Sequence, residues 1–229
     1  MDLSGRRILV TGGTGALGQR IAERLRSAGA MTVIAGAGQS DRLSAAMAHS
    51  PAFAVDLSRT GSGEALIDAV RAGGGLDGIV FAHGVVAFGS VSEMPSSISE
   101  RVMAINLTSV IEITAAAIPL LQESAAAGGS PFVVTMSGVI SESAMPGMGV
   151  YGASKAGVRH FVAAAARELR RDGIRVLDTR PPHTETGLAG RAVAGTAPQF
   201  PTGANPDDVA ARIVSAIVHD EKDVASTDF

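Results

Sequence analysis

RILVTGGTGALG, residues 7–18, decides the fold of this chain. Its opening run, Ile8 to Val10, is short, apolar and rich in β-formers, which predicts a buried parallel strand. Glycines follow directly, and then Leu17, Ile21 and Leu25 recur at helical spacing. A strand, a glycine turn and a helix in this order are typical of a dinucleotide-binding turn.

The glycines of this turn remove side chains where a backbone must approach a pyrophosphate, and the helix that follows offers free N–H groups. The turn residues expected to bind a dinucleotide are Gly12, Thr14, Gly15, Ala16 and Leu17.

Strand-like runs recur along the rest of the chain and alternate with helical patterns. They lie at Thr32–Ala35, Phe53–Val55, Gly78–Ala82, Pro131–Met136 and Ile174–Leu177, with a seventh, edge strand at Asp223–Thr227. This alternation predicts an α/β fold with right-handed crossovers. We expect one Rossmann-like, doubly wound sheet of six to seven mostly parallel strands with helices on both faces, formed by residues 1–229 as a single domain.

Composition narrows the function. The net charge of −3 and the 3% aromatic content speak against a nucleic-acid partner. The 229 residues include no cysteine, which excludes disulfides, thiolate catalysis and cysteine-bound metal, and we expect no metal site. A strand-like run from Arg6 leaves no room for a signal peptide, and apolar stretches such as Ile113–Leu121 are too short to span a bilayer. We therefore expect a cytoplasmic protein with no membrane partner.

The main candidate for catalysis is Tyr151-Gly152-Ala153-Ser154-Lys155. Four residues apart in a helix, the Tyr151 and Lys155 side chains share one face. A free phenol ionises near pH ~10, and a nearby ammonium stabilises the phenolate and lowers that pKa. Tyr151 thereby becomes a usable general acid or base. It is also the only tyrosine in the chain.

Over almost its whole length the chain resembles the short-chain dehydrogenase/reductase family. The motifs that carry this resemblance occur in the family's order: the glycine turn, Asp56 after the third strand, Ala82-His83-Gly84, Asn106, the Tyr151/Lys155 pair and Pro181 after the sixth strand. The amino-acid sequence of Thr11–Gly18 is similar to the corresponding turn of polyketide and fatty-acid ketoreductases.

The resemblance implies that the chain interconverts a carbonyl and an alcohol by hydride transfer with NAD(P)(H). Tyr151 would exchange the proton, Lys155 would hold the nicotinamide ribose, and Asn106 would connect Lys155 to a water relay. Outside the glycine turn, the residues implied at the cofactor are Gly36, Asp56, Leu57, Ala82, His83, Gly84, Tyr151, Lys155, Pro181, Thr184 and Thr186. A homodimer or homotetramer is the family expectation.

Two positions depart from the family pattern. Pro182 stands where the family usually has glycine, and it removes an N–H. In the family's register the catalytic serine position falls on Gly138, and Ser137 comes one residue early. Ser137 substitutes only if the strand end bends, and Ser141 or Ser143 are alternatives. A missing hydroxyl would cost roughly 10²-fold in rate. This keeps open a second function, a dinucleotide-binding sensor or catalytically silent partner subunit.

Cofactor and substrate preferences follow from local chemistry. The second strand ends in Gly36-Ala37-Gly38 without the acid that usually holds the NAD ribose, and Arg42 lies near in sequence, which favours NADP(H) over NAD(H). Residues 183–205 predict a loop that covers the substrate. The expected pocket wall is apolar, which suits a small uncharged or weakly polar carbonyl or alcohol; it comprises Val86, Phe88, Met145, Met148 and Leu188. Thr-Gly-x-x-Gly-x-x-Gly also fits the family's extended branch, which acts on nucleotide sugars.

Overall fold

The computed structural model describes residues 1–37 and 41–229, and its centre is a seven-stranded sheet in which every neighbouring pair of strands is parallel. The strand order is β3-β2-β1-β4-β5-β6-β7. The strands are β1 (Arg7–Thr11), β2 (Met31–Gly36), β3 (Ala52–Ala54), β4 (Gly78–Phe81), β5 (Phe132–Met136), β6 (Arg175–Thr179) and β7 (Asp223–Val224). The expected doubly wound Rossmann-like sheet is confirmed.

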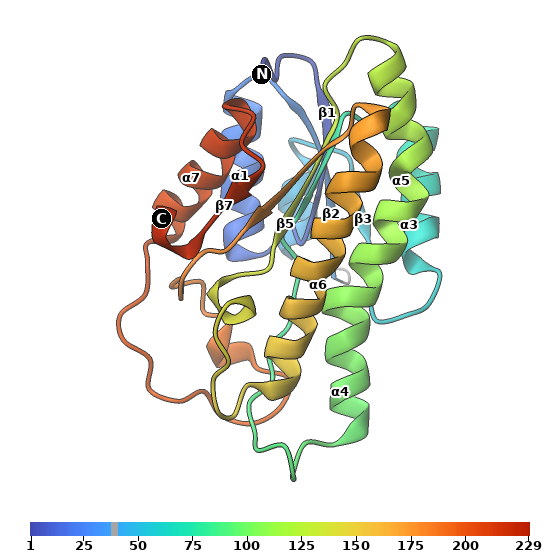
Figure 1. Ribbon diagram of the computed structural model, residues 1–229. Coiled ribbons are helices and arrows are strands. Elements are labelled where there is room, and N and C mark those ends of the chain that lie inside the picture. Colours follow the sequence, from blue (N-terminus) through green and yellow to red (C-terminus); the bar gives the residue numbers. More distant parts are fainter. Residues whose placement is uncertain (38–40) are drawn as a thin grey trace.

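Helices cover both faces of this sheet (Figure 1). They are α1 (Ala16–Ser27), α2 (Asp41–Met47), α3 (Ser62–Ala72), α4 (Ser96–Met103), α5 (Ser109–Ala126), α6 (Gly149–Glu168) and α7 (Pro206–Val218). Alternate residues of each strand face opposite layers. In β1, Ile8 and Val10 join the core under α1 and α7, whereas Leu9 joins the core under α3, α5 and α6.

From β1 the chain adds β2 and β3 on one side of the sheet and then β4 to β7 on the other. This change of side places a topological switch point between β1 and β4. Thr11 pairs with Phe81 at the carboxyl ends of these strands, and the Ala82 N–H donates to the Thr11 carbonyl at 2.9 Å. Ligands of open α/β sheets bind in the crevice outside such a point. The fold therefore directs attention to the residues that follow β1, β4, β5 and β6.

Residues 96–126 form one continuous helical stretch in which α4 leads through a π-helical turn, Ala104–Thr108, into α5. Among the described residues, this stretch is long and apolar enough to cross a membrane by length and composition. The expectation that the apolar stretches are too short to span a bilayer was wrong for this helix. It considered only uninterrupted apolar residues, whereas the mean hydropathy of a helix tolerates a few polar ones. Its buried positions, including Ile113, Ala117 and Leu121, pack in the sheet core, as in the core helix of a globular protein.

The edge strands differ from the prediction in position or length. Strand β3 begins and ends one residue early, and β7 comprises only two residues. A 3₁₀ turn, Ser226–Asp228, replaces the predicted end of β7, because the Asp228 carboxylate accepts the Ala225 N–H at 2.9 Å and closes the chain into a turn. Pro119 lies inside α5, while the π-helical irregularity occurs at Asn106. Gly38 falls outside the described residues.

Candidate functional site

The turn between β1 and α1 leaves no room for a side chain at Gly12. Its φ is +69°, and an added Cβ would lie 2.5 Å from the His83 backbone nitrogen. Helix α1 begins after Gly15 with no side-chain cap and no acidic residue in its first turn. The backbone N–H groups of Ala16 to Gly18 make no hydrogen bond with any described residue. A bare helix N-terminus behind a glycine turn fits an anionic pyrophosphate.

The next strand brings Gly36 against this turn. A Cβ on Gly36 would lie 2.6 Å from Thr14 Oγ1, so the end of β2 and the glycine turn are in contact. Ala37 and Arg42 are both exposed. Asp56, after β3, is exposed, and its carboxylate accepts both the N–H (3.0 Å) and the hydroxyl (2.6 Å) of Ser58. These hydrogen bonds, chiefly the one from the hydroxyl, lower the pKa of Asp56.

His83, at the end of β4, is held by three hydrogen bonds. Nδ1 lies 2.7 Å from Thr11 Oγ1, and Nε2 lies 2.9 Å from both the Ile105 carbonyl and Ser109 Oγ. A carbonyl can only accept, so Nε2 carries the proton and Nδ1 accepts from Thr11. Burial and the charge of Lys155 lower the pKa of His83 to about 4. His83 is therefore a neutral, structural link between β1, β4 and the π-helical turn.

Asn106 clamps the segment after β4. Its Oδ1 accepts the Val85 N–H and its Nδ2 donates to the Val85 carbonyl, both at 2.9 Å, and Nδ2 also lies 3.0 Å from Ser154 Oγ. A Cβ on Gly84 would lie 3.3 Å from Asn106 Oδ1 and 3.7 Å from Lys155 Nζ. The residues predicted to serve the relay, Asn106 and Lys155, thus both border Gly84.

Tyr151 lies in the first turn of α6 and packs on an apolar cluster rather than on a charge. Its hydroxyl makes no hydrogen bond with any described residue. Burial raises the pKa of Tyr151 to about 12. The expected lowering by Lys155 is therefore absent in the chain alone, in which desolvation is the cause of the shift.

Lys155, one turn further along α6, is only 9% exposed, and its Nζ donates to the Met136 carbonyl at 2.8 Å. Burial lowers the pKa of Lys155 to about 8, although the charge of Asp178 acts to raise it. The amine therefore still carries its charge at pH 7, although it titrates well below an ordinary lysine.

The strand end after β5 does not present Ser137 to Tyr151. Ser137 is fully buried, and its hydroxyl donates to Asp178 Oδ2 at 2.6 Å. Ser141 Oγ donates to the Gly138 carbonyl at 2.7 Å, and Ser143 is exposed. Gly138 has φ 72° and ψ 165°, a conformation essentially restricted to glycine. A serine at this position would therefore be strained.

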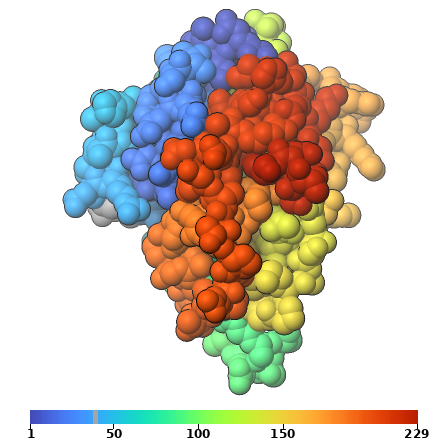
Figure 2. Space-filling view, turned by 90° about the vertical axis from the view of Figure 1, so that its left-hand side faces the viewer, coloured from blue at the N-terminus to red at the C-terminus, as the bar shows by residue number. Residues whose placement is uncertain are grey.

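The segment after β6 closes over the site. Thr184 Oγ1 donates to the Pro182 carbonyl at 2.9 Å, and Thr186 Oγ1 accepts the Leu188 N–H at 3.4 Å, so both threonine hydroxyls have local partners. The Ala204 N–H donates to the His183 carbonyl at 2.7 Å and closes the base of a loop. Figure 2 shows this loop in orange beside the yellow residues near 145.

The far side of this loop is tied to the segment after β4. The Val193 N–H donates to the Val86 carbonyl at 2.8 Å, and the Phe88 N–H donates to the Ala194 carbonyl at 2.9 Å. An apolar cluster forms beneath these contacts and includes Val86, Phe88, Met148, Tyr151, Leu188 and Phe200. The predicted wall is thus assembled except for Met145, which is 43% exposed and lies outside the cluster.

The structure brings the β1–α1 turn, Gly36, His83, Gly84, Asn106 and Lys155 together around the switch point through the contacts above. Ala82 directly follows β4 and Pro181 lies two residues after β6, and the Pro181 carbonyl accepts the Val139 N–H at 3.0 Å. Leu57 packs on the apolar core near β3. The roles of these residues toward a ligand stay predictions.

Two charged residues that sequence reasoning missed lie directly behind this site. Asp178 and Arg180 are both 4% exposed on and just after β6. The available signal was their position, an aspartate and an arginine in and beside a strand whose other inward residues are apolar or hydroxylic. Charged residues are almost never fully buried unless they are paired.

Comparisons with known proteins agree with this geometry. Residues 6–196 match the family described as short chain dehydrogenase. An uncharacterised oxidoreductase of Methylorubrum extorquens is 30% identical over 96% of this chain and 92% of its own length.

Two solved structures share the fold. One is a short-chain dehydrogenase from Sphingobium yanoikuyae in complex with NADPH, with TM-score 0.86, 24% identity, and coverage of 96% of this chain and 87% of that one. The other is a 3-ketoacyl-(acyl-carrier-protein) reductase from Brucella melitensis complexed with NADH, with TM-score 0.86, 21% identity, and coverage of 97% of both chains. Together with the family match, the glycine turn and the α6 pair, these findings establish that the chain belongs to the short-chain dehydrogenase/reductase family of NAD(P)-dependent oxidoreductases.

Proposed function

We propose that this protein interconverts a carbonyl and an alcohol, with Tyr151 as the proton-exchanging group. The observation that carries this proposal is the position of Tyr151. Its hydroxyl makes no hydrogen bond with residues 1–37 or 41–229, and its ring packs on the apolar cluster of Val86, Phe88 and Met148, one helical turn from Lys155. An unengaged hydroxyl at the edge of this apolar cluster is available to a substrate oxygen.

The residues at the switch point fit a nicotinamide dinucleotide. Gly12 and Gly36 let the ends of β1 and β2 approach the neighbouring backbone and the glycine turn closely, because a Cβ at either position would collide with His83 or Thr14. The α1 N-terminus offers N–H groups that make no hydrogen bond with the described residues, and these suit a pyrophosphate. When bound, the cofactor supplies or accepts the hydride. Lys155 would hold its ribose and, as a cation, stabilise the Tyr151 phenolate. Tyr151 would give its proton to the substrate oxygen in reduction and remove it in oxidation.

The covered apolar cluster supports a small uncharged or weakly polar carbonyl or alcohol as substrate. Its members are aliphatic, aromatic and thioether side chains, and methionine adapts readily to varied apolar shapes. The loop of residues 183–205 would exclude water from the reacting atoms, which strengthens electrostatic interactions there.

We propose NADP(H) as the preferred cofactor. Strand β2 ends at Gly36, and the described residue after it, Ala37, carries no acid that would repel a 2′-phosphate. Arg42, at the start of α2, is exposed and within reach in sequence as a phosphate partner. We further propose a homodimer or homotetramer, which light scattering after gel filtration tests directly.

The test of function combines binding and turnover. We expect NADPH to raise the melting temperature more than NADH does, and a panel of ketones and alcohols with the preferred cofactor to reveal turnover. Tyr151→Phe should abolish turnover and keep dinucleotide binding, because only the hydroxyl is removed. Binding without turnover in the wild type would instead identify a sensor or silent partner subunit, which the position of Gly138 makes a specific alternative. No binding of either dinucleotide would refute the nucleotide site.

A further inference from the structure

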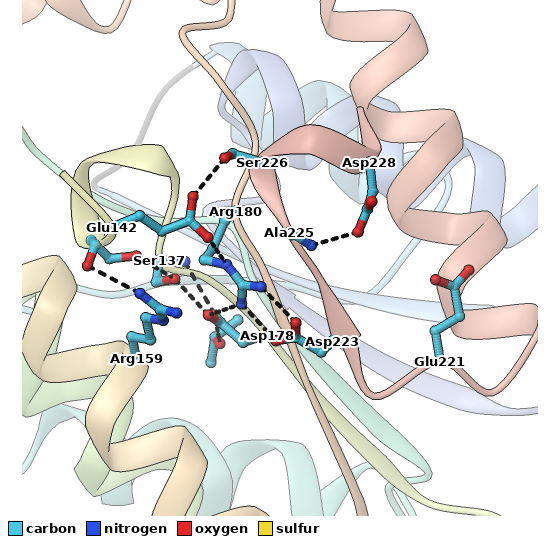
Figure 3. A network of polar contacts seen from close by, with 12 residues as sticks. Ser137, Glu142, Arg159, Asp178, Arg180, Glu221, Asp223, Ala225, Ser226 and Asp228 are labelled. Carbon is cyan, nitrogen blue, oxygen red and sulfur yellow. Dashed lines mark hydrogen bonds and ion pairs between the residues drawn. The ribbon is translucent and has the colours of Figure 1, made fainter.

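A charge network is centred on two buried residues, Asp178 and Arg180, and reaches the surface at Glu142 and Asp223. Arg180 contacts three carboxylates: Asp178 at 3.3 Å through Nη1, Asp223 at 2.6 Å through both Nη1 and Nη2, and Glu142 through Nε (Figure 3). Ser226 Oγ donates to the other oxygen of Glu142 at 2.5 Å. Figure 3 shows Arg180 at the centre, with Glu142 on one side and Asp223 on the other. The network thus joins the ends of β6 and β7 to the loop after β5.

Asp178 faces the end of β5 with every oxygen engaged. Its Oδ1 accepts Thr135 Oγ1 at 2.7 Å and the Ser137 N–H at 3.3 Å, and its Oδ2 accepts Ser137 Oγ at 2.6 Å. These contacts fix Thr135 and Ser137, which are two residues apart and therefore lie on the same side of the chain at the end of β5. The carboxylate is 4% exposed, so solvent screens its field only weakly.

One peptide group connects Asp178 to Lys155. The Met136–Ser137 peptide donates its N–H to Asp178, as above, and accepts Lys155 Nζ through its carbonyl at 2.8 Å. The positive end of this peptide dipole therefore meets a carboxylate and its negative end meets an amine. Hydrogen bonds in such a chain polarise one another, so that each strengthens its neighbour.

We propose that Asp178, held in place by Arg180, is a positioning residue for Lys155, and that it acts through the Met136–Ser137 peptide to fix the amine and keep it charged. The role of Lys155 rests on the proposed function, whereas the link between Asp178 and Lys155 does not. Ser137 is then the residue that orients Asp178, which accounts for a hydroxyl that donates to this carboxylate and not to Tyr151.

The other titratable or polar groups near Lys155 carry no negative charge, so Asp178 is the anion that acts on its amine. His83, from the end of β4, is neutral because its pKa lies at about 4. Tyr151, from the same helix, holds its proton because burial raises its pKa to about 12. Asn106, from the π-helical turn, is uncharged. The cation Arg180 contacts Asp178 through Oδ2, whereas the peptide N–H is accepted by Oδ1. Burial alone would discharge Lys155 further, and the carboxylate opposes it.

The test is a direct titration of Lys155 by NMR with labelled lysine. The chain has only two lysines, Lys155 and the exposed Lys222, so the Lys222→Arg variant leaves a single signal. In that background the wild-type midpoint should lie at about 8. Asp178→Asn keeps the shape of the side chain and removes its charge, and it should lower the midpoint by about one pH unit.

Asp223→Asn is the matched control, because it removes the same charge from the same arginine without touching the Met136–Ser137 peptide. It should leave the Lys155 midpoint in place. An unchanged midpoint in Asp178→Asn, or an equal fall in Asp223→Asn, would overturn the proposal.

A measurement on the unsubstituted chain covers the case in which Asp178→Asn does not fold. The Ser137 amide resonance should shift with the Lys155 midpoint, since the same peptide joins them, and an amide that is insensitive to this titration would refute the link. None of these readings uses turnover. An inactive protein with the expected titrations would refute the proposed function and leave the Asp178–Lys155 link standing.

Discussion

Restoring a serine at position 138 should harm this protein rather than repair it. Gly138 has φ 72° and ψ 165°, a region that costs residues with a Cβ about 1–3 kcal/mol. A Cβ there would meet only the Pro181 carbonyl oxygen, at 3.7 Å, which is ordinary contact. The backbone therefore accounts for the whole penalty. We expect Gly138→Ser to lower the free energy of unfolding by about 1–3 kcal/mol and the melting temperature by roughly 2 to 12 °C.

Urea unfolding at equilibrium measures this change, and two further variants locate its cause. Gly138→Ala should lose as much stability as Gly138→Ser, because both carry the same strained Cβ. Gly152→Ala lies inside α6, where its Cβ would be 3.6 Å from Ile140, and should gain up to about 1 kcal/mol.

Turnover completes the test of Gly138. The added hydroxyl should not deliver the roughly 10²-fold gain expected of an oxyanion donor, because the strained backbone does not hold it in the family's geometry. A Gly138→Ser protein as stable as the wild type, with higher turnover, would show that the strand end shifts freely and would refute this reasoning.

Two further predictions concern protons. Tyr151 is the only tyrosine and there is no tryptophan, so the near-ultraviolet absorbance of the free protein should report one phenol that ionises at about 12; ionisation at the ordinary value of 10.0 would contradict its burial. Burial and Lys155 lower the pKa of His83 from 6.5 to about 4. The folded protein therefore favours the neutral ring, so the contribution of His83 to the free energy of unfolding is present above pH 6.5 and is lost as the pH falls through 4. The free energy of unfolding in urea should therefore differ between wild type and His83→Gln by an amount that changes by at most about 3 kcal/mol over that pH window, since the ring keeps some exposure. A difference that stays constant with pH would show that His83 is not buried as a neutral ring.

Much of the architecture follows from local sequence. Short β-rich runs such as Ile8–Val10 are apolar on both faces, which only a strand covered by helices on both sides tolerates. The glycines after β1 have no alternative to a tight turn, and the spacing of Tyr151 and Lys155 puts both on one face of α6. The edges were harder to predict, because a strand with one neighbour is limited by local turn contacts such as that of Asp228 with Ala225.

Within the site, the sequence identified the reactive groups but not their pKa values. It indicated an acidified tyrosine, whereas burial against the apolar cluster raises the pKa of Tyr151 and lowers that of Lys155. Such shifts depend on how many apolar neighbours arrive from distant parts of the chain, which spacing along one helix does not contain.

By itself, the sequence determined the order of strands and helices, the glycine turn and the presence of one phenol four residues before one amine, because these depend on periodicity and backbone freedom within a few residues. Only the tertiary structure decided that Gly138 takes up a conformation closed to serine and that Asp178 and Lys155 meet the two ends of the Met136–Ser137 peptide. Strands β5 and β6 are 38 residues apart between Met136 and Arg175, and hydrogen bonds between them exist only once the sheet has brought them side by side.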